Sequence, residues 1–201
     1  MISSLFIPAF ELVLASESPR RRDILIQAGV PFLIRPSGIA EIKRADENAA
    51  SYVARLAREK AVSIVATPNQ GILAADTTVV LSDAGCERIL EKPLDAVEAK
   101  AMLTSLQGRS HTVLTALCFR YRDNYWHHVE HTQVSIAAMS PSDINSYVHS
   151  GEPFGKAGAY AIQGLASRYV SHIEGCYFNV VGLPIHRVFT LFDQAGVLAK
   201  A

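Results

Sequence analysis

The chain has 201 residues, of which 49% are hydrophobic and 19% are charged, and this mixture excludes a disordered chain. Its formal net charge of +0 excludes a broad electrostatic attraction to nucleic acid or to an anionic membrane. A chain of this length is expected to form one large domain, or one domain with two lobes around a cleft.

Cysteine content and the N-terminal sequence indicate a cellular compartment. Cys86, Cys118 and Cys176 are far apart and fit neither a disulfide framework nor a zinc site, which favours a reducing cytosol. The N-terminal segment is apolar but short and lacks a basic region, so we do not expect a signal peptide. No apolar stretch is long enough to span a bilayer, and we therefore expect a cytoplasmic protein.

The first part of the chain alternates between strand-like and helical segments, which predicts an α/β fold. Ser18 and Pro19 indicate the start of a helix, because serine caps helices and proline suits the first helical position. Apolar residues at helical spacing then predict a longer helix. The expected elements are a buried strand at 11–16, a helix at 20–28, a strand at 30–35, a helix at 47–66 and a strand-like run at 71–81.

The remaining chain continues this alternation, and Asp95 and Ser140 are the expected N-caps of two further helices. Residues 122–124 separate two long strand-like runs and predict a hairpin. The expected elements are a helix at 95–106, strands at 110–121 and 125–138, a helix at 140–148, a glycine-rich loop at 151–164, a strand at 168–173 and a helix at 184–195.

The first candidate site lies where the first strand gives way to the first helix. Three consecutive arginines, Arg20–Arg22, stand at the end of the helix where the dipole is positive, which is unfavourable unless an anion or carboxylates offset them. Free N–H groups at such an end bind anions, so we interpret Ser16, Ser18, Arg20 and Arg21 as a phosphate cradle. The alternative is a capped helix with solvated arginines.

Two charged residues lie in apolar surroundings. Asp76 interrupts the run GILAADTTVVL, where a carboxylate is costly unless it is paired or binds a metal, so we favour a functional role over a turn aspartate. Lys60 falls within the apolar stripe of the helix expected at 47–66. Its ammonium group either points into a site, toward phosphate or Asp76, or reaches water beside a packed stem; taken alone, the second interpretation is favoured.

Long segments of the chain, in order, resemble the Maf family of nucleotide pyrophosphatases. The matching segments are LASESPRRRDIL at 14–25, ARLAREKA at 54–61, AADTTVVL at 74–81, a run at 90–117 that begins LEKPLD, and a run at 151–185 that contains GKAGAYAIQG. The resemblance implies a single domain over residues 1–201, with a mixed, strongly curved sheet flanked by helices. It further implies two lobes around a central cleft, an architecture like that of inosine triphosphate pyrophosphatases.

The resemblance also implies an activity. Family members split a nucleoside triphosphate between its α- and β-phosphates, need a divalent metal such as Mg²⁺ or Mn²⁺, and are commonly homodimers. Asp76, Lys60 and Lys92 match catalytic positions, and Asp76 and Glu41 match the positions expected to bind the metal. The positions expected to bind substrate are Ser16, Ser18, Arg20, Arg21, Thr77 and Gln163. Whether Asp76 acts as a general base, as a metal ligand or as both is left open.

Arg20, Thr77 and Gln163 resemble the branch of the family that acts on dTTP and UTP. A glutamine amide presents one acceptor and one donor, which matches O4 and N3–H of uracil or thymine. Gly155 stands where this branch usually has aspartate, and Glu17 lies within the expected phosphate cradle. These departures leave two alternatives open: a pyrophosphatase for modified nucleotides, and a nucleotide-binding regulator of septum formation with weak catalysis.

Overall fold

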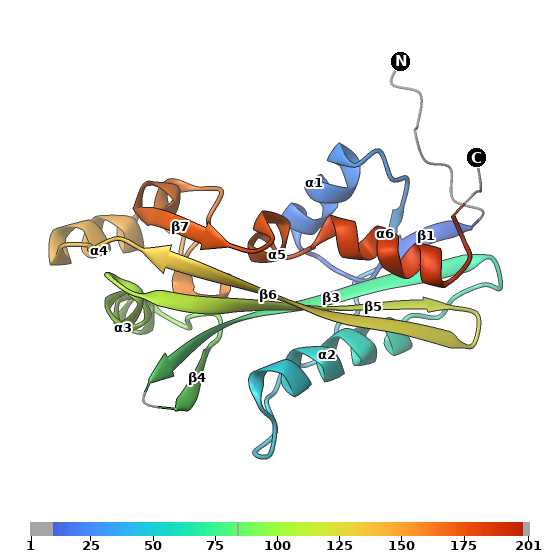
Figure 1. Cartoon of the computed structure of the whole chain (residues 1–201), viewed down its shortest axis with the longest axis horizontal. Coiled ribbons are helices and arrows are strands. Elements are labelled where there is room, and N and C mark those ends of the chain that lie inside the picture. Colours follow the sequence, from blue (N-terminus) through green and yellow to red (C-terminus); the bar gives the residue numbers. More distant parts are fainter. Residues whose placement is uncertain (1–9, 84, 199–201) are drawn as a thin grey trace. The chain divides into compact units, whose positions relative to one another are not determined.

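The computed structural model describes residues 10–83 and 85–198 of the chain (Figure 1). The N-terminal segment considered for a signal peptide lies largely outside the described residues. The elements are, in chain order, β1 (Glu11–Leu14), α1 (Pro19–Gln27), β2 (Leu33–Ile34), α2 (Ala49–Ser63), β3 (Gln70–Asp83), β4 (Cys86–Leu90), α3 (Ala96–Leu106), β5 (Ser110–Tyr121), β6 (Asn124–Ile136), α4 (Pro141–His149), the 3₁₀ helices η1 (Ala157–Ala159) and η2 (Leu165–Tyr169), β7 (Val170–Glu174), α5 (Tyr177–Val181) and α6 (Ile185–Gln194).

The strands form a seven-stranded mixed sheet. They follow the hydrogen-bonded order β2-β1-β3-β5-β6-β7, and β4 pairs with β3 outside this path. β1 is parallel to β2 and β3, whereas β4 and β7 are antiparallel to β3 and β6. Helices flank the strands, so the expected α/β class with a mixed sheet is confirmed. Within the described part of the chain, no helix is both long and apolar enough to cross a membrane.

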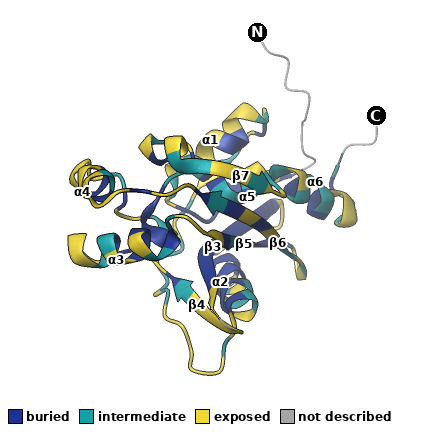
Figure 2. Ribbon diagram, turned by 60° about the vertical axis from the view of Figure 1, so that its left-hand side comes forward, coloured by how far each residue is buried: buried dark blue, intermediate teal, exposed yellow. Residues whose placement is uncertain are grey.

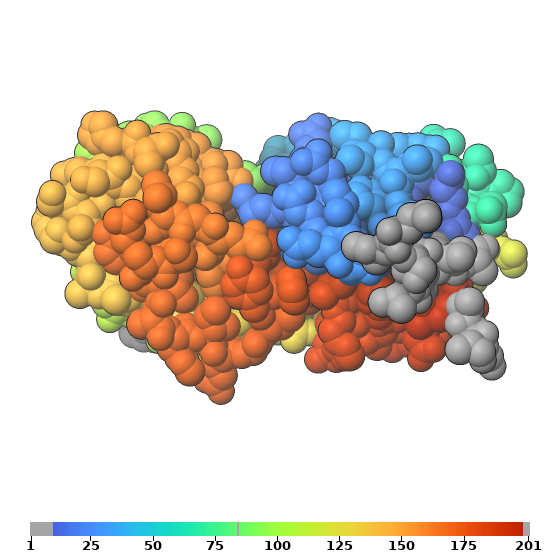
Figure 3. All heavy atoms as spheres, turned by 90° about the horizontal axis from the view of Figure 1, so that it is seen from above, coloured from blue at the N-terminus to red at the C-terminus, as the bar shows by residue number. Residues whose placement is uncertain are grey.

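The described residues divide into two compact units. The first contains the chain up to Asp76, Thr115–Glu130 and the chain from Gly182 onward; the second contains Thr77–Leu114 and His131–Val181. In the first unit, α1 and α6 lie on one face of the strands and α2 lies on the other (Figure 1). Figure 3 shows the blue residues near the start of this unit directly against the red residues near its end. Distant parts of the sequence therefore build the first unit together.

The core of the first unit explains why its strands form. Leu12, Leu14, Ile72 and Leu73 are fully buried, and Figure 2 shows the buried colour along β3 and β5 and on one side of α2. A strand buried on both faces is expected to be a near-continuous apolar run, and β1 and the first part of β3 have this composition. This continuous burial sets the surroundings of Asp76, the last residue of the unit's β3 segment.

In the second unit, α3 contacts both α4 and η1. Gly158 lies in η1 with a φ of +69°, and a Cβ atom there would lie 2.9 Å from the side chain of Val79. Its N–H group donates to the carbonyl of Glu91, 3.1 Å away. Glycine at this position therefore lets the loop after α4 pack against β3 and the end of β4.

Most element boundaries agree with the expected ones to within a few residues, but the structure differs from the expectations at several points. The strand expected at 30–35 is reduced to Leu33–Ile34, because Pro31 cannot donate a ladder hydrogen bond. The interpretation of Asp76 as a turn residue is wrong, since β3 continues unbroken through it. Ser18 occupies the N-cap position of α1 but makes no capping hydrogen bond with its side chain. The strand β4 and the helix α5 were not expected.

Acid stability is expected to depend on His111, a buried residue of the second unit whose Nε2 lies 2.8 Å from the hydroxyl of Tyr160. Burial lowers the pKa of His111 from 6.5 to about 4, so the folded protein keeps this ring neutral where the unfolded chain protonates it. The contribution of the neutral His111 ring to the free energy of unfolding is therefore fully present above pH 6.5 and is lost as the pH falls toward 4. The expected loss is on the order of 3 kcal/mol in the free energy of unfolding.

Urea unfolding between pH 4 and pH 7 measures this loss. The control is a double variant, His111→Phe with Tyr160→Phe, which removes both hydrogen-bonding partners together and so leaves no unpaired buried group. The difference in unfolding free energy between wild type and control should shrink as the pH falls through this window. An unchanged difference would contradict the role given to His111.

Candidate active site

Asp76 lies in the middle of β3, after five buried residues, Gly71–Ala75. Its side chain is itself buried, with the residue only 6% exposed. A carboxylate in such a position is costly unless cations and hydrogen bonds compensate it. The structure supplies this compensation from α2.

Lys60 of α2 bridges two carboxylates. Its Nζ lies 2.6 Å from Oδ1 of Asp76 and 2.5 Å from Oε1 of Glu41. The lysine is 6% exposed, so the interpretation of Lys60 as a side chain that reaches water is wrong. A buried ammonium group between two carboxylates forms the charged centre of this site.

The electrostatics of Asp76 follow from its burial. Burial raises the pKa of Asp76, and the positive charges of Lys60 and Arg21 oppose this effect without cancelling it. Burial also lowers the pKa of Arg21, which the charges of Asp76 and Glu41 oppose. The carboxyl group is consequently a stronger base than an ordinary aspartate. Perturbed pKa values of this kind cluster at functional sites.

Arg21 is the second cation of the centre, and it is held from two sides. Its Nε donates to the carbonyl of Gly182 at 2.8 Å, and its Nη1 donates to Oγ of Ser16 at 3.1 Å. Ser16 is buried at the end of β1, and its Oγ also accepts the N–H of Ser18 at 3.2 Å. These bonds fix the guanidinium group at the start of α1.

Arg20 is half-buried, and its burial lowers the pKa of its guanidinium group. Arg22 is exposed and pairs with Asp23, so it stands apart from the centre. Glu17 has an exposed side chain, although its position in the sequence had placed it within the expected phosphate cradle. The start of α1 thus offers N–H groups and two arginines, Arg20 and Arg21, to an anion.

The segment that carries Glu41 is fastened to α2 through its backbone. The hydroxyl of Tyr52 donates to the carbonyl of Glu41 at 3.2 Å, and Nη2 of Arg55 donates to the carbonyl of Ile42 at 2.9 Å. Arg55 in turn forms ion pairs with Glu47 and Glu59. Because Lys60 lies on the same helix, α2 positions both the ammonium group and its second carboxylate.

Of the residues expected at the site, the first unit brings together Ser16, Arg21, Glu41, Lys60 and Asp76. Thr77, Lys92 and Gln163 belong to the second unit. There, Thr77 is half-buried on β3, Lys92 is exposed just after β4, and Gln163 is exposed in the loop that follows η1.

The donor atoms of the first unit suit a hard cation. Mg²⁺ and Mn²⁺ prefer oxygen ligands and are commonly held by one or two carboxylates together with substrate phosphates. Asp76 and Glu41 present two carboxylates to one centre. Among residues 10–83 and 85–198, no group of three or more His, Cys, Asp or Glu side chains is placed to hold a metal ion. Asp76 and Glu41 could therefore supply two ligands to such a cation.

Sequence patterns did not indicate three residues that build this centre. Gly182 supplies only a backbone carbonyl, and its bond to Arg21 joins positions 161 residues apart. Tyr52 and Arg55 act on the backbone of the Glu41 segment, from a helix face that looked like an ordinary amphipathic surface. Of these, only Arg55 has a pattern from which its contacts could have been predicted, because Glu59 follows it four residues later on the same helix.

Two solved structures resemble parts of the fold weakly. A HAM1 protein from Coxiella burnetii has a TM-score of 0.40 and 15% identity, with 65% of this chain and 74% of that chain covered. A nucleoside-triphosphatase / dITP/XTP pyrophosphatase from Mycobacterium abscessus has a TM-score of 0.35 and 15% identity, with coverage of 70% and 95%. These similarities are too weak to bear on the site.

Sequence relatives are much closer. A protein from Myxococcus xanthus is 48% identical over 92% of this chain and 93% of its own length. A protein from Koribacter versatilis is 45% identical over 93% of this chain and 95% of its own length. A third, from Vibrio parahaemolyticus, is 43% identical over 92% and 97%. All three are named dTTP/UTP pyrophosphatase. The family described as Maf-like protein matches residues 11–195, so the chain belongs to the Maf family.

Proposed function

We propose that this protein is a nucleoside triphosphate pyrophosphatase that hydrolyses dTTP and UTP to the monophosphate and pyrophosphate. The observation that carries the proposal is the buried centre in which Lys60 bridges Asp76 and Glu41 beside Arg21. The relatives named dTTP/UTP pyrophosphatase, at 41–48% identity, support the choice of reaction and substrate.

The chemistry follows from the charges of the centre. Hydrolysis of a phosphoanhydride requires a positioned water and cations that stabilise charge on the phosphate oxygens. Arg21, held by Ser16 and Gly182, and Arg20 beside it bind phosphate oxygens at the start of α1. Lys60 contributes a further positive charge. Asp76, whose pKa burial raises, accepts the proton of the attacking water at its carboxylate.

A divalent cation fits this scheme. Asp76 and Glu41 would hold Mg²⁺ or Mn²⁺ together with phosphate oxygens of the substrate. When bound, the metal would neutralise phosphate charge and lower the pKa of a water molecule. Because Lys60 contacts both carboxylates, it also limits their repulsion.

The remaining assigned residues are Ser18 of the first unit and Thr77, Lys92 and Gln163 of the second unit. Lys92 takes a phosphate group, and Thr77 and Ser18 supply polar contacts to the nucleotide. Gln163 recognises the base, since its amide offers one donor and one acceptor to N3–H and O4 of thymine or uracil. We further propose that the protein acts in the cytoplasm and forms a homodimer; sedimentation of the purified chain tests the oligomeric state.

Replacing Gln163 by alanine is expected to weaken base preference. The side chain is exposed, so its loss should leave the fold intact. Loss of a donor and an acceptor to the base should lower the ratio of kcat/KM for dTTP to that for dCTP by about 10- to 100-fold. Steady-state kinetics with the two substrates measures this ratio, and a variant that keeps the wild-type preference would exclude Gln163 from base recognition.

Pyrophosphate release from the common ribo- and deoxyribonucleoside triphosphates, and from triphosphates with a methylated or oxidised base, tests the proposed function as a whole when measured with Mg²⁺ or Mn²⁺. We expect dTTP and UTP to have the highest kcat/KM in this panel. Preference for a methylated or oxidised base would instead support the pyrophosphatase for modified nucleotides. Nucleotide binding without turnover under either metal would support a regulator.

A further inference from the structure

The segment that carries Gln163 is held on both sides by two side chains of the second unit. Before Gln163, the N–H group of Ala161 donates to the hydroxyl of Tyr147 at 3.2 Å. After it, the N–H group of Leu165 donates to the carboxylate of Glu152 at 2.9 Å, and that of Ala166 does so at 3.3 Å. Gln163 therefore lies between two anchored stretches of backbone.

Tyr147 and Glu152 act as one group. The hydroxyl of Tyr147 donates a hydrogen bond to Oε1 of Glu152 at 2.8 Å, and the oxygen of the same hydroxyl accepts the N–H group of Ala161. Burial raises the pKa of Tyr147, which keeps it protonated. Burial alone would raise the pKa of Glu152, but the bonds from Leu165, Tyr147 and Ala166 outweigh it and lower that pKa. The carboxylate is thus ionised and accepts hydrogen bonds from the hydroxyl of Tyr147 and from the N–H groups of Leu165 and Ala166.

The turn itself leaves little freedom. The N–H group of Gly164 bonds to the carbonyl of Ala161 at 3.1 Å and closes the turn around Gln163. A Cβ atom on Gly164 would lie 2.2 Å from Oε2 of Glu152, so a larger residue here would displace the carboxylate from its present position. The backbone beside Gln163 therefore packs directly on the group that holds it.

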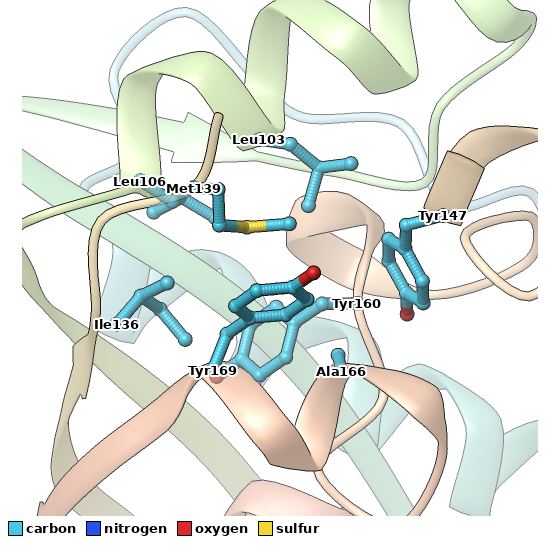
Figure 4. A pocket seen from close by; sticks show the side chains of 8 residues that line it. All are labelled: Leu103, Leu106, Ile136, Met139, Tyr147, Tyr160, Ala166 and Tyr169. Atoms are coloured by element: carbon cyan, nitrogen blue, oxygen red, sulfur yellow. The ribbon is translucent and has the colours of Figure 1, made fainter. Parts of the chain in front are cut away.

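The ring of Tyr147 is buried and packs beside apolar side chains of the second unit. Figure 4 shows Tyr147, Tyr160 and Ala166 around a small apolar pocket that Leu103 and Met139 also line. Its volume is about 10 Å³, roughly the room that one water molecule requires, so it is far too small for a nucleobase. The pocket is consequently part of the packing beneath the turn.

We propose that Glu152 and Tyr147 are positioning residues that set base preference by fixing the backbone on either side of Gln163. This inference rests on the proposed function, in which Gln163 recognises the pyrimidine. The anchored residues lie within three positions of Gln163, and the bonds act on its backbone. Loosening them should misplace the amide without removing any cation that binds phosphate.

We call Tyr147, Glu152 and their hydrogen bonds to the backbone of Ala161, Leu165 and Ala166 the clamp. Three variants loosen this clamp in different ways. Tyr147→Phe removes the hydroxyl, Glu152→Gln replaces half of the acceptor capacity by an NH₂ group, and Gly164→Ala places a methyl group against the carboxylate. For each, kcat/KM is measured for dTTP and dCTP, together with inhibition by pyrophosphate. The matched controls, Glu174→Gln and Tyr177→Phe, change exposed residues of the same unit.

We expect each clamp variant to lower the dTTP-to-dCTP ratio by about 10-fold, mainly through a higher KM for dTTP. The inhibition constant of pyrophosphate should stay within about twofold of wild type, and the controls should keep the wild-type ratio. Equal losses for both substrates, or an unchanged ratio in Tyr147→Phe, would reduce the clamp to a structural role and overturn the inference. Failure of the wild type to hydrolyse either nucleotide would instead refute the proposed function.

Discussion

Asp76→Asn is expected to lower kcat/KM for dTTP and UTP by at least about 100-fold, the size typical of a lost general base. The substitution keeps the shape of the side chain but removes its negative charge, so it can neither accept a proton nor attract a cation strongly. Lys60 retains Glu41 as a partner, and the fold should therefore survive. Pyrophosphate release at saturating Mg²⁺ measures the effect, and thermal unfolding checks the fold.

Asp83→Asn is the matched control, because Asp83 ends the same strand but is exposed and pairs with Arg109. Because this pair is exposed and screened by water, its loss should keep activity within about twofold of wild type. Excess Mn²⁺ separates two roles of Asp76. Partial recovery of Asp76→Asn indicates a lost metal ligand, and no recovery indicates a lost base. Near wild-type activity in Asp76→Asn would remove the carboxylate from the mechanism.

Lys60→Met is expected to destabilise the protein by about 3–5 kcal/mol as well as to abolish turnover. The methionine fills similar space, but Asp76 then lies buried without the ammonium group that contacts it at 2.6 Å. Two carboxylates without this cation should attract a divalent metal more strongly. Mn²⁺ alone should therefore raise the melting temperature of the variant by more than it raises that of the wild type.

Lys43→Met serves as the control for this result, since Lys43 is exposed and its Nζ contacts only a nearby carbonyl among the bonds described for it. Differential scanning fluorimetry measures the melting temperature of each variant and its rise with Mn²⁺, and neither measurement relies on activity. A Lys60→Met protein as stable as wild type, with the same response to Mn²⁺, would show that Lys60 does not neutralise the two carboxylates.

The charged residues of the centre could be predicted because they violate the pattern around them. Asp76 stands within an apolar strand and Lys60 within an apolar helix face, and each violation indicates a compensating partner. Taken singly, however, Lys60 favoured the wrong interpretation, because a lysine stem often packs while its head reaches water. Only the fold brings Glu41 to the same ammonium group.

Other features left no usable trace in the sequence. The strand β4 is exposed along most of its length, so it lacks the apolar alternation that predicts strands. The helix α5 has five residues, too few for helical periodicity to emerge. The bond between Arg21 and Gly182 joins a side chain to a backbone carbonyl, and a carbonyl has no sequence signature. Contacts of this kind depend on tertiary structure alone.

The products of dTTP hydrolysis test the proposed reaction and the role of Asp76 most directly. Purified wild-type protein and Asp76→Asn are incubated with dTTP and Mg²⁺, and the products are separated by anion-exchange chromatography. We expect dTMP and pyrophosphate in equal amounts from the wild type, and almost none of either from the variant. Formation of dTDP and inorganic phosphate, or of the same products by Asp76→Asn at the wild-type rate, would contradict the proposed reaction and the role of Asp76 in it.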